Sequence, residues 1–111
     1  MFDVYDPRRC HVFLTEQRYY GHIRKRHPEM DRVAYIEDAI IEPDIITRDE
    51  SNELREIYYR RGAHPDYPTE WVKVVVEQGA VITAYVIHHP RSTEEVIWTS
   101  PHFSAPRPQS D

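Results

Sequence analysis

Two runs of strand-forming residues in the second half of the chain constrain its fold more than any other feature. Residues 71–77 and 80–87 are rich in valine and isoleucine, and only Gln78 and Gly79 separate them. Two such runs joined by a two-residue connection with glycine are typical of a tight antiparallel hairpin. With the turn at this connection, Val74 is expected to lie opposite Thr83, on one apolar side of the sheet. The sequence therefore predicts an antiparallel sheet that contains this hairpin.

Two amphipathic segments before the hairpin are predicted to be helices. Thr15 is a suitable N-cap for a first helix over residues 16–27, and Pro28 ends it, because the residue before a proline avoids the helical region. The second helix begins at residue 29 or 31 and stops before Pro43. Its apolar residues recur at helical spacing, and they are Val33, Ile36, Ala39 and Ile40.

Shorter apolar runs predict the remaining strands. Residues 11–14 form a short strand or an extended lead-in, and residues 45–48 and 54–61 form a hairpin-like pair. Residues 96–98 add an edge strand. Two helices followed by four strands are typical of an α+β domain with helices on an antiparallel sheet.

The whole chain is predicted to form one α+β domain, with two N-terminal helices packed on a four- to five-stranded antiparallel sheet. Its 111 residues leave no room for a second hydrophobic core. The domain is expected to span residues 1–99. Residues 100–111 contain three prolines and no apolar periodicity, so we expect a flexible tail there.

Charge and cysteine content narrow the classes of function. A net charge of -5 argues against an indiscriminate nucleic-acid binder, which needs a broad basic surface, but it is compatible with a local basic cleft. Cys10 is the single cysteine, which excludes an internal disulfide and a four-cysteine zinc module. The first residues lack the pattern of a signal peptide, and no apolar run is long enough to span a bilayer. We expect a cytoplasmic protein without a membrane partner.

The first predicted helix has a basic face that suits phosphate chemistry. Arg18, His22 and Arg26 are spaced four residues apart, so they lie above one another on a helix, and Lys25 joins them. Neighbouring cations lower the proton affinity of a histidine. His22 is then partly neutral near neutral pH, which suits a general acid or base. The alternative interpretation is a solvated cationic helix face.

The histidines of the sequence do not specify a metal site. His22 and His27 are five residues apart, so they point in different directions on an α-helix and do not form a ligand pair. His88 and His89 are adjacent, which directs their rings to opposite faces of a strand. We therefore expect no metal ion and no cofactor.

One predicted strand interleaves arginine with tyrosine. Arg55, Tyr58 and Arg60 lie in residues 54–61. In this pattern, guanidinium groups can hold phosphates while rings stack on the bases of single-stranded RNA. The same pattern equally suits cation–π packing on a sheet surface. Thr83, among apolar neighbours, either supplies a functional hydroxyl or is present for its β-propensity.

Four short motifs follow one another along most of the chain. They are His22-Ile23 with Arg26-His27-Pro28-Glu29, Ile40 with Pro43-Asp44-Ile45-Ile46, Trp71-Val72-Lys73-Val74-Val75, and Val81-Ile82-Thr83-Ala84-Tyr85. In this order they resemble the phage-associated branch of the barnase–EndoU–colicin–RelE nuclease group. The resemblance implies a small α+β domain that cleaves RNA without a metal ion, in toxin or phage-conflict systems.

The resemblance also assigns roles to particular residues. The residues that it implies to be catalytic are His22, His27, Thr83 and Tyr85. One arginine of the middle strands is implied to assist them, and the candidates are Arg60, Arg55 and Arg48. The residues expected to bind RNA are Arg18, Lys25, Arg26, Arg55 and Tyr58.

Two hypotheses of function follow. In the first, the protein is a metal-independent endoribonuclease of toxin or phage-conflict type. A base removes the ribose 2′-OH proton, the 2′-oxygen attacks phosphorus, and an acid protonates the departing 5′-oxygen, leaving a 2′,3′-cyclic phosphate. The RNA would be a tRNA or a message by analogy, and a cognate antitoxin or immunity protein would be a second partner.

In the second hypothesis, the chain is a non-catalytic binding module, such as an inhibitor, immunity or accessory protein. Acidic residues in the middle of the sequence would then face a basic partner by electrostatic complementarity. These residues are Glu37, Asp38, Glu42, Asp44, Asp49, Glu50, Glu53 and Glu56.

Overall fold

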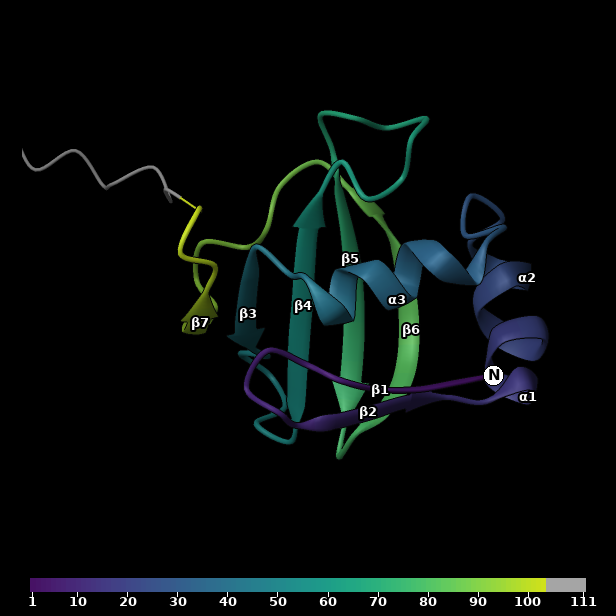
Figure 1. Cartoon of the computed structure of the whole chain (residues 1–111), viewed down its shortest axis with the longest axis horizontal. Helices are drawn as coiled ribbons and strands as arrows, with labels where there is room; N and C mark the ends of the chain where they lie inside the picture. The colour runs from purple at the N-terminus through teal and green to yellow at the C-terminus, as the bar shows by residue number, and fades with distance from the viewer. Residues whose placement is uncertain (104–111) are drawn as a thin grey trace, which may run out of the picture.

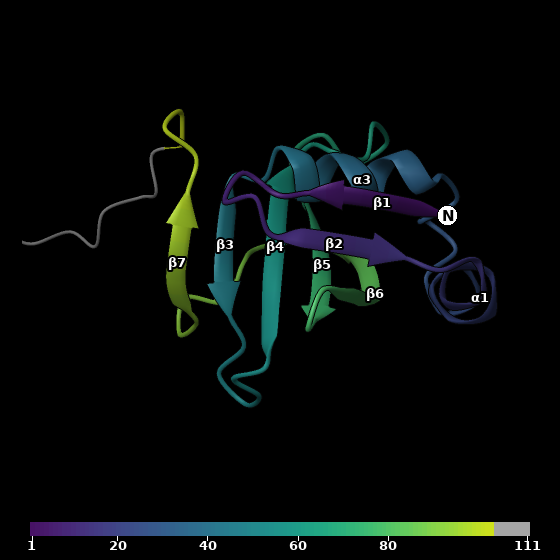
Figure 2. The same ribbon diagram turned by 60° about the horizontal axis from the view of Figure 1, so that its bottom comes forward.

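A single seven-stranded sheet dominates the computed structural model, which describes residues 1–103 (Figure 1). The strands are β1 (Phe2–Tyr5), β2 (His11–Leu14), β3 (Ile45–Arg48), β4 (Arg55–Arg61), β5 (Trp71–Glu77), β6 (Ala80–Ile87) and β7 (Glu95–Thr99). Their order across the sheet is β1-β2-β6-β5-β4-β3-β7. Figure 2 shows β1 and β2 running across the direction of β3 to β6, so the sheet curls into a half-barrel.

The predicted fold class is wrong in the number of strands, in their pairing and in the placement of the helices. The sheet has seven strands and is mixed, because β2 pairs with β6 in parallel through Phe13 and Ala80. The sequence did not predict β1, whose four residues give too short a pattern to read. Its partner β2 stabilises it, in antiparallel register from Phe2 opposite Leu14 to Tyr5 opposite His11.

The predicted first helix is confirmed over residues 16–26, but it contains an unexpected π-helical turn. Its parts are α1 (Glu16–Arg18), η1 (Tyr19–Ile23) and α2 (Arg24–Arg26). The Thr15 hydroxyl caps it by accepting a hydrogen bond from the Arg18 N–H at 3.1 Å. The Arg24 N–H donates to the carbonyl of Tyr19, five residues back, which widens the turn. This helix lies beside β6 and not on a sheet face (Figure 1). Because β6 pairs with β2 only at Ala80 in the described structure, the rest of β6 has a free side there, which we call the β6 edge.

The second predicted helix is confirmed as α3 (Val33–Ile41), which covers one face of the sheet (Figure 1). It contacts β1, β4 and β5 and buries Ile36, Ala39 and Ile40. The main core lies between α3 and the sheet, and it includes Val12, Leu14, Tyr19, Ile23, Met30, Ile46, Tyr58, Val72, Val74, Val76, Val81 and Ala84. Within residues 1–103, no helix is long and apolar enough to cross a membrane.

The sheet face opposite α3, called here the open face, carries a smaller apolar cluster. Its buried members are Ile45, Ile57, Tyr59, Trp71 and Val75. Phe103 packs against this cluster, with its ring edge-on to Trp71 at a centroid distance of 5.7 Å. The Ser100 N–H donates to the Asp44 carbonyl at 2.9 Å. The rest of the expected tail, residues 104–111, lies outside the described residues.

The β5–β6 hairpin has the predicted turn, but a β-bulge shifts its register. Val76 lies opposite Val81 as expected, and the register then slips between Val75 and Val76. Thr83 therefore lies opposite Val75, and the prediction that it lies opposite Val74 is wrong. A slip of one residue moves the following side chains to the other face. Thr83 lies on the open face instead of in the main core.

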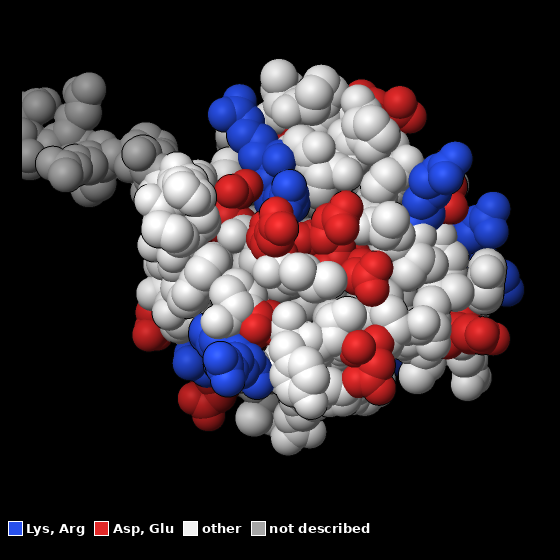
Figure 3. Space-filling view, viewed as in Figure 1, with Lys and Arg blue, Asp and Glu red and all other residues white. Residues whose placement is uncertain are grey.

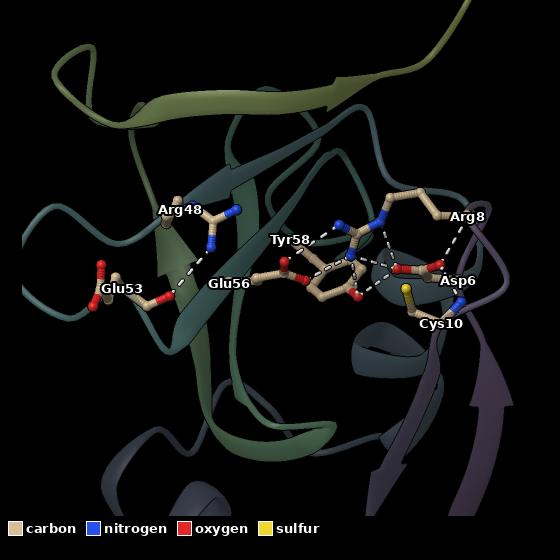
Figure 4. Close-up of polar contacts among 7 residues, drawn as sticks. All are labelled: Asp6, Arg8, Cys10, Arg48, Glu53, Glu56 and Tyr58. Carbon is tan, nitrogen blue, oxygen red and sulfur yellow. Dashed lines mark hydrogen bonds and ion pairs between the residues drawn. The ribbon is translucent and has the colours of Figure 1, made fainter.

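A buried polar cluster fixes the β1–β2 hairpin to β4 (Figure 4). The Asp6 carboxylate accepts hydrogen bonds from the Tyr58 hydroxyl at 2.6 Å, from the Arg8 guanidinium at 2.7 Å and from the Cys10 N–H at 2.9 Å. Arg8 also bonds Glu56 at 2.6 Å. Burial alone would raise the pKa of Asp6, but these hydrogen bonds outweigh it and hold the pKa below its usual value. Burial and the bond to Asp6 raise the pKa of Tyr58.

Candidate functional site

A hollow on the open face lies over the middle of β4, β5 and β6. It gathers three cations with hydroxyl and carboxyl groups over an apolar floor. We call it the sheet hollow, and its polar lining includes Arg55, Lys73, Thr83, Tyr85, Arg91 and Glu94. The half-barrel curvature and the bulge in β6 bring these side chains to the same side of the sheet.

The hydroxyl of Thr83 is buried in this hollow without a hydrogen-bond partner. Among the described residues, its Oγ1 is the one buried side-chain oxygen or nitrogen left unsatisfied. An unsatisfied buried hydroxyl costs about 1–3 kcal/mol of stability. A valine would fit a strand at least as well without that cost. This hydroxyl is therefore free to form a hydrogen bond with a group that enters the hollow.

Lys73 is a nearly buried cation with no carboxylate at ion-pair distance among the described residues. The residue is 9% exposed, and its ammonium lies 5.5 Å from the ring centroid of Tyr85 and 5.9 Å from that of Tyr59. It takes part in none of the ion pairs formed by residues 1–103, whereas Arg55 and Arg91 each pair with a glutamate. Aromatic faces stabilise such a cation only in part, so Lys73 favours the entry of an anion.

Glu94 supplies a buried carboxylate at the β7 side of the sheet hollow. Its Oε1 accepts hydrogen bonds from the Tyr59 hydroxyl at 2.6 Å and from the Thr47 hydroxyl at 2.8 Å. Burial, with the bond to Glu94, raises the pKa of Tyr59 well above its usual value, so Tyr59 acts as a donor. Both bonds fall on one oxygen, which leaves Oε2 for a further partner.

His27 reaches the β6 side of the sheet hollow. Its ring stacks on the ring of Tyr85, with centroids 4.7 Å apart and planes 26° from parallel. The His27 N–H still donates to the Ile23 carbonyl at 2.7 Å, so the end of the helix sets its position. The pair places a titratable ring at the rim of the hollow that Tyr85 lines.

The residues after His27 are anchored on both sides. The Glu29 carboxylate accepts from the Val86 N–H at 3.2 Å, and the Glu29 carbonyl lies 2.7 Å from Nε2 of His64. His64 is buried, and its Nδ1 accepts from the Asp66 N–H at 3.1 Å. Nε2 therefore carries the ring proton and donates a hydrogen bond to the Glu29 carbonyl. His64 is thus a structural residue that helps to hold the chain where His27 meets Tyr85.

The structure brings together four of the residues that the sequence singled out. Thr83, Tyr85 and Arg55 line the sheet hollow, and His27 stacks at its rim. They come from β6, β4 and the end of the first helix, which are far apart in the sequence. Three charged residues of the hollow, Lys73, Arg91 and Glu94, were missed as site candidates.

Other predicted site residues lie away from the sheet hollow. Arg60 follows Tyr58 by two positions and shares its side of β4, where it bonds the carbonyl and carboxylate of Glu42 at 2.9 and 3.1 Å. Tyr58 is buried in the main core and bonded to Asp6. Arg48 donates to the Glu53 carbonyl at 3.2 Å.

The basic helix residues form a neighbouring surface. His22 and Arg18 line a second hollow on the first helix, while Lys25 and Arg26 are exposed on α2. Partial burial lowers the pKa of His22, and the positive charges of Arg18, Arg26 and His27 lower it further. The predicted direction of this shift is confirmed.

Of the three missed residues, only Lys73 left a signal in the sequence. It interrupts a strand that is otherwise apolar from Trp71 to Val76, and a lone cation in a buried strand needs a reason. Glu94 lies in a polar stretch, and only its contacts with β3 and β4 distinguish it from the neighbouring Glu95. In residues 1–103, no three His, Cys, Asp or Glu side chains gather in an arrangement that would hold a metal ion.

The family model for "Uncharacterised protein aq_aa01" matches residues 7–99, and the chain belongs to this family. The matched range includes the first helix, the sheet hollow and all of β7. No curated protein and no solved structure matches the chain.

Proposed function

We propose that this member of the aq_aa01 family is an endoribonuclease of toxin or phage-conflict type that cleaves RNA in the sheet hollow without a metal ion. One observation carries the proposal: an unpaired, nearly buried cation and an unpartnered buried hydroxyl, Lys73 and Thr83, line the same hollow. Both are donors that gain a partner when an anionic phosphate oxygen enters.

Charge stabilisation is the first part of the mechanism. Attack of the ribose 2′-oxygen on phosphorus produces a phosphorane with additional negative charge on its non-bridging oxygens. The Lys73 ammonium and the Thr83 hydroxyl donate to these oxygens, and Arg55 and Arg91 add positive charge at the same hollow. Donors that are fixed before the reaction stabilise the transition state more effectively than water does.

Proton transfer is the second part, and His27 and Glu94 are the groups at the hollow that suit it. One of them accepts the 2′-OH proton, and the other donates a proton to the 5′-oxygen as its bond to phosphorus breaks. The products are a 2′,3′-cyclic phosphate and a free 5′-hydroxyl. His22 was expected to be catalytic, but it lines the hollow on the first helix and not the sheet hollow, so we assign it the role of an RNA contact instead.

The proposal also names partners. A ribonuclease of this type acts on tRNA or messenger RNA and is held inactive in its own cell by an antitoxin or immunity protein. We expect that partner to bind over the sheet hollow, because covering Lys73 and Thr83 excludes RNA.

Metal removal tests the proposed chemistry. The purified chain is incubated with total RNA in excess EDTA, and we expect undiminished cleavage with products that end in a 2′,3′-cyclic phosphate. A Lys73→Met variant purified in parallel controls for contaminating ribonucleases. Complete loss of cleavage in EDTA, with recovery on addition of one divalent ion, contradicts the metal-free mechanism.

Intact RNA in the same assay favours the second hypothesis, a binding module for a basic partner. Acidic side chains gather over α3, on the face away from the sheet hollow (Figure 3). Glu37 and Asp38 of α3 form no ion pair with any described residue, so their charge is available to a partner. This surface and the sheet hollow lie on opposite faces of the sheet.

A further inference from the structure

The second hollow lies on the first helix, and we call it the helix hollow. It is lined by Thr15, Gln17, Arg18, Gly21 and His22. It combines hydrogen-bonding groups with a cation and a titratable ring, and it opens to solvent beside the β6 edge of the sheet.

Gly21 has no structural reason to be glycine. A Cβ at this position would meet no heavy atom within 4 Å. Its backbone is helical, so no left-handed conformation requires glycine. Glycine inside a helix is less stable than alanine. Glycine at position 21 therefore lowers the stability of the helix without a structural gain. A ligand that approaches the open backbone closely would explain its presence.

The cations around the helix hollow lack ionic partners. Arg18, Arg24, Lys25 and Arg26 form no ion pair with any residue in the described part of the chain, whereas four arginines elsewhere, Arg8, Arg55, Arg60 and Arg91, pair with carboxylates. Basic side chains gather on the side of the molecule where Figure 1 places α2 (Figure 3). Clustered like charges repel one another, and a bound anion offsets the repulsion.

The helix hollow is connected to the sheet hollow through the two histidines. His22, which lines the helix hollow, lies in the same helix five residues before His27, which caps the helix end. His27 stacks on Tyr85, which lines the sheet hollow. The His27–Tyr85 pair thus forms a bridge of aromatic surface between the two hollows at the β6 edge.

We propose that the helix hollow binds a second phosphate of the RNA backbone, several bonds away from the phosphate in the sheet hollow. The substrate is then a single-stranded polynucleotide that runs from the sheet hollow over the β6 edge to the helix. A flexible single strand follows such a bend and can stack a base at the aromatic bridge, which a stacked duplex cannot do. This inference rests on the proposed function, and it specifies the form of the RNA.

The variant Gly21→Ala tests this subsite. The added methyl group occupies the open space and keeps the backbone phosphate away, while it improves helix propensity. We expect a higher Tm together with RNA binding that is about tenfold weaker. A tenfold loss corresponds to the loss of one charge-assisted hydrogen bond. The probe is a single-stranded oligoribonucleotide with 2′-O-methyl groups, which cannot be cleaved by 2′-OH attack.

Arg18→Ala and Arg24→Ala are a matched pair for the charge. Each removes one cation from the same helix, but only Arg18 lines the helix hollow. We expect Arg18→Ala to lower the slope of log affinity against log salt by about 0.7, the value for one phosphate contact on a single strand. Arg24→Ala is expected to change this slope much less.

Two substrates separate this inference from the proposed function. A dinucleotide with one phosphodiester bond fills only the sheet hollow, so Gly21→Ala should cleave it as fast as the wild type while cleaving a longer single strand more slowly. Binding of the uncleavable probe by Gly21→Ala at wild-type strength overturns the subsite, even where cleavage persists. Weakened probe binding in a chain that cleaves neither substrate supports the subsite and contradicts the ribonuclease.

Discussion

The buried hydroxyl of Thr83 connects stability with the proposed activity at the scale of single residues. Because it has no hydrogen-bond partner in the described structure, its removal should relieve a cost rather than create one. We expect Thr83→Val to raise the free energy of unfolding by about 1 kcal/mol and to lower kcat by about 10² if the hydroxyl stabilises the transition state. Urea unfolding and cleavage of an RNA oligonucleotide measure the two effects.

Thr47 provides the matched control for this substitution. Its hydroxyl lies on the same face and donates to Glu94 at 2.8 Å, so Thr47→Val should lower the free energy of unfolding by about 1 kcal/mol. Two outcomes would show that the Thr83 hydroxyl has a structural role only. Thr83→Val would lose as much stability as Thr47→Val, or it would keep full activity.

The sequence identified part of the site because some of its residues lie in recognisable motifs. His27, Thr83 and Tyr85 were named in advance because they lie in the motifs that resemble the nuclease group. Lys73 and Glu94 became candidates only through their contacts across strands, with Tyr59 and Tyr85 or with Thr47. Such contacts depend on the register of the whole sheet, which local patterns do not determine.

At the scale of elements, long periodic segments were predictable and short or irregular ones were not. The bounds of β5 and β6 agree with the predicted 71–77 and 80–87, and α3 has its apolar residues where helical spacing placed them. The four-residue β1, the parallel pairing of β2 and the bulge in the hairpin depend on partners distant in sequence. The bulge had the largest consequence, because it moved Thr83 to the other face.

The β1–β2 hairpin depends on Asp6, which predicts a pH effect. The pKa of Asp6 is lowered in the folded state, so its stabilising contribution is complete above the unfolded pKa of about 4 and is lost as pH falls through the folded value. Asp6→Asn should abolish this part of the acid dependence. At pH 7, Asp6→Asn should lower the free energy of unfolding by about 2 kcal/mol or more, because the positive charge of Arg8 loses a buried partner. Unfolding in urea at several pH values measures both effects.

Glu42→Gln is the control for the Asp6 substitution. Glu42 pairs with Arg60 at 3.1 Å, but its side chain is 73% exposed, and exposed pairs contribute about 0–1 kcal/mol. The stability of Glu42→Gln at pH 7 should therefore stay close to that of the wild type. Equal effects of Asp6→Asn and Glu42→Gln would mean that the buried cluster does not fix the hairpin to β4.

At the scale of the whole molecule, the distribution of charge matters more than its sum. The net charge of -5 gives no indication of an anion site, yet the acidic side chains over α3 lie on the face away from Arg55, Lys73 and Arg91 (Figure 3). An acidic protein can thus gather three cations in one hollow, and the acidic face reduces non-specific binding. Only the fold shows this separation, because Arg55, Lys73 and Arg91 lie far apart in the sequence and come together only in the folded sheet.

The comparison of Lys73→Met with Arg60→Met tests most directly whether the sheet hollow is the ribonuclease site. Both changes remove one cation and keep a long side chain, but Lys73 lies in the hollow and Arg60 lies on the other side of β4. With a single-stranded RNA substrate in EDTA, we expect kcat/KM to fall by about 10² or more in Lys73→Met and to change by less than about threefold in Arg60→Met. Equal losses in the two folded variants, or wild-type cleavage by Lys73→Met, would contradict the assignment of the site.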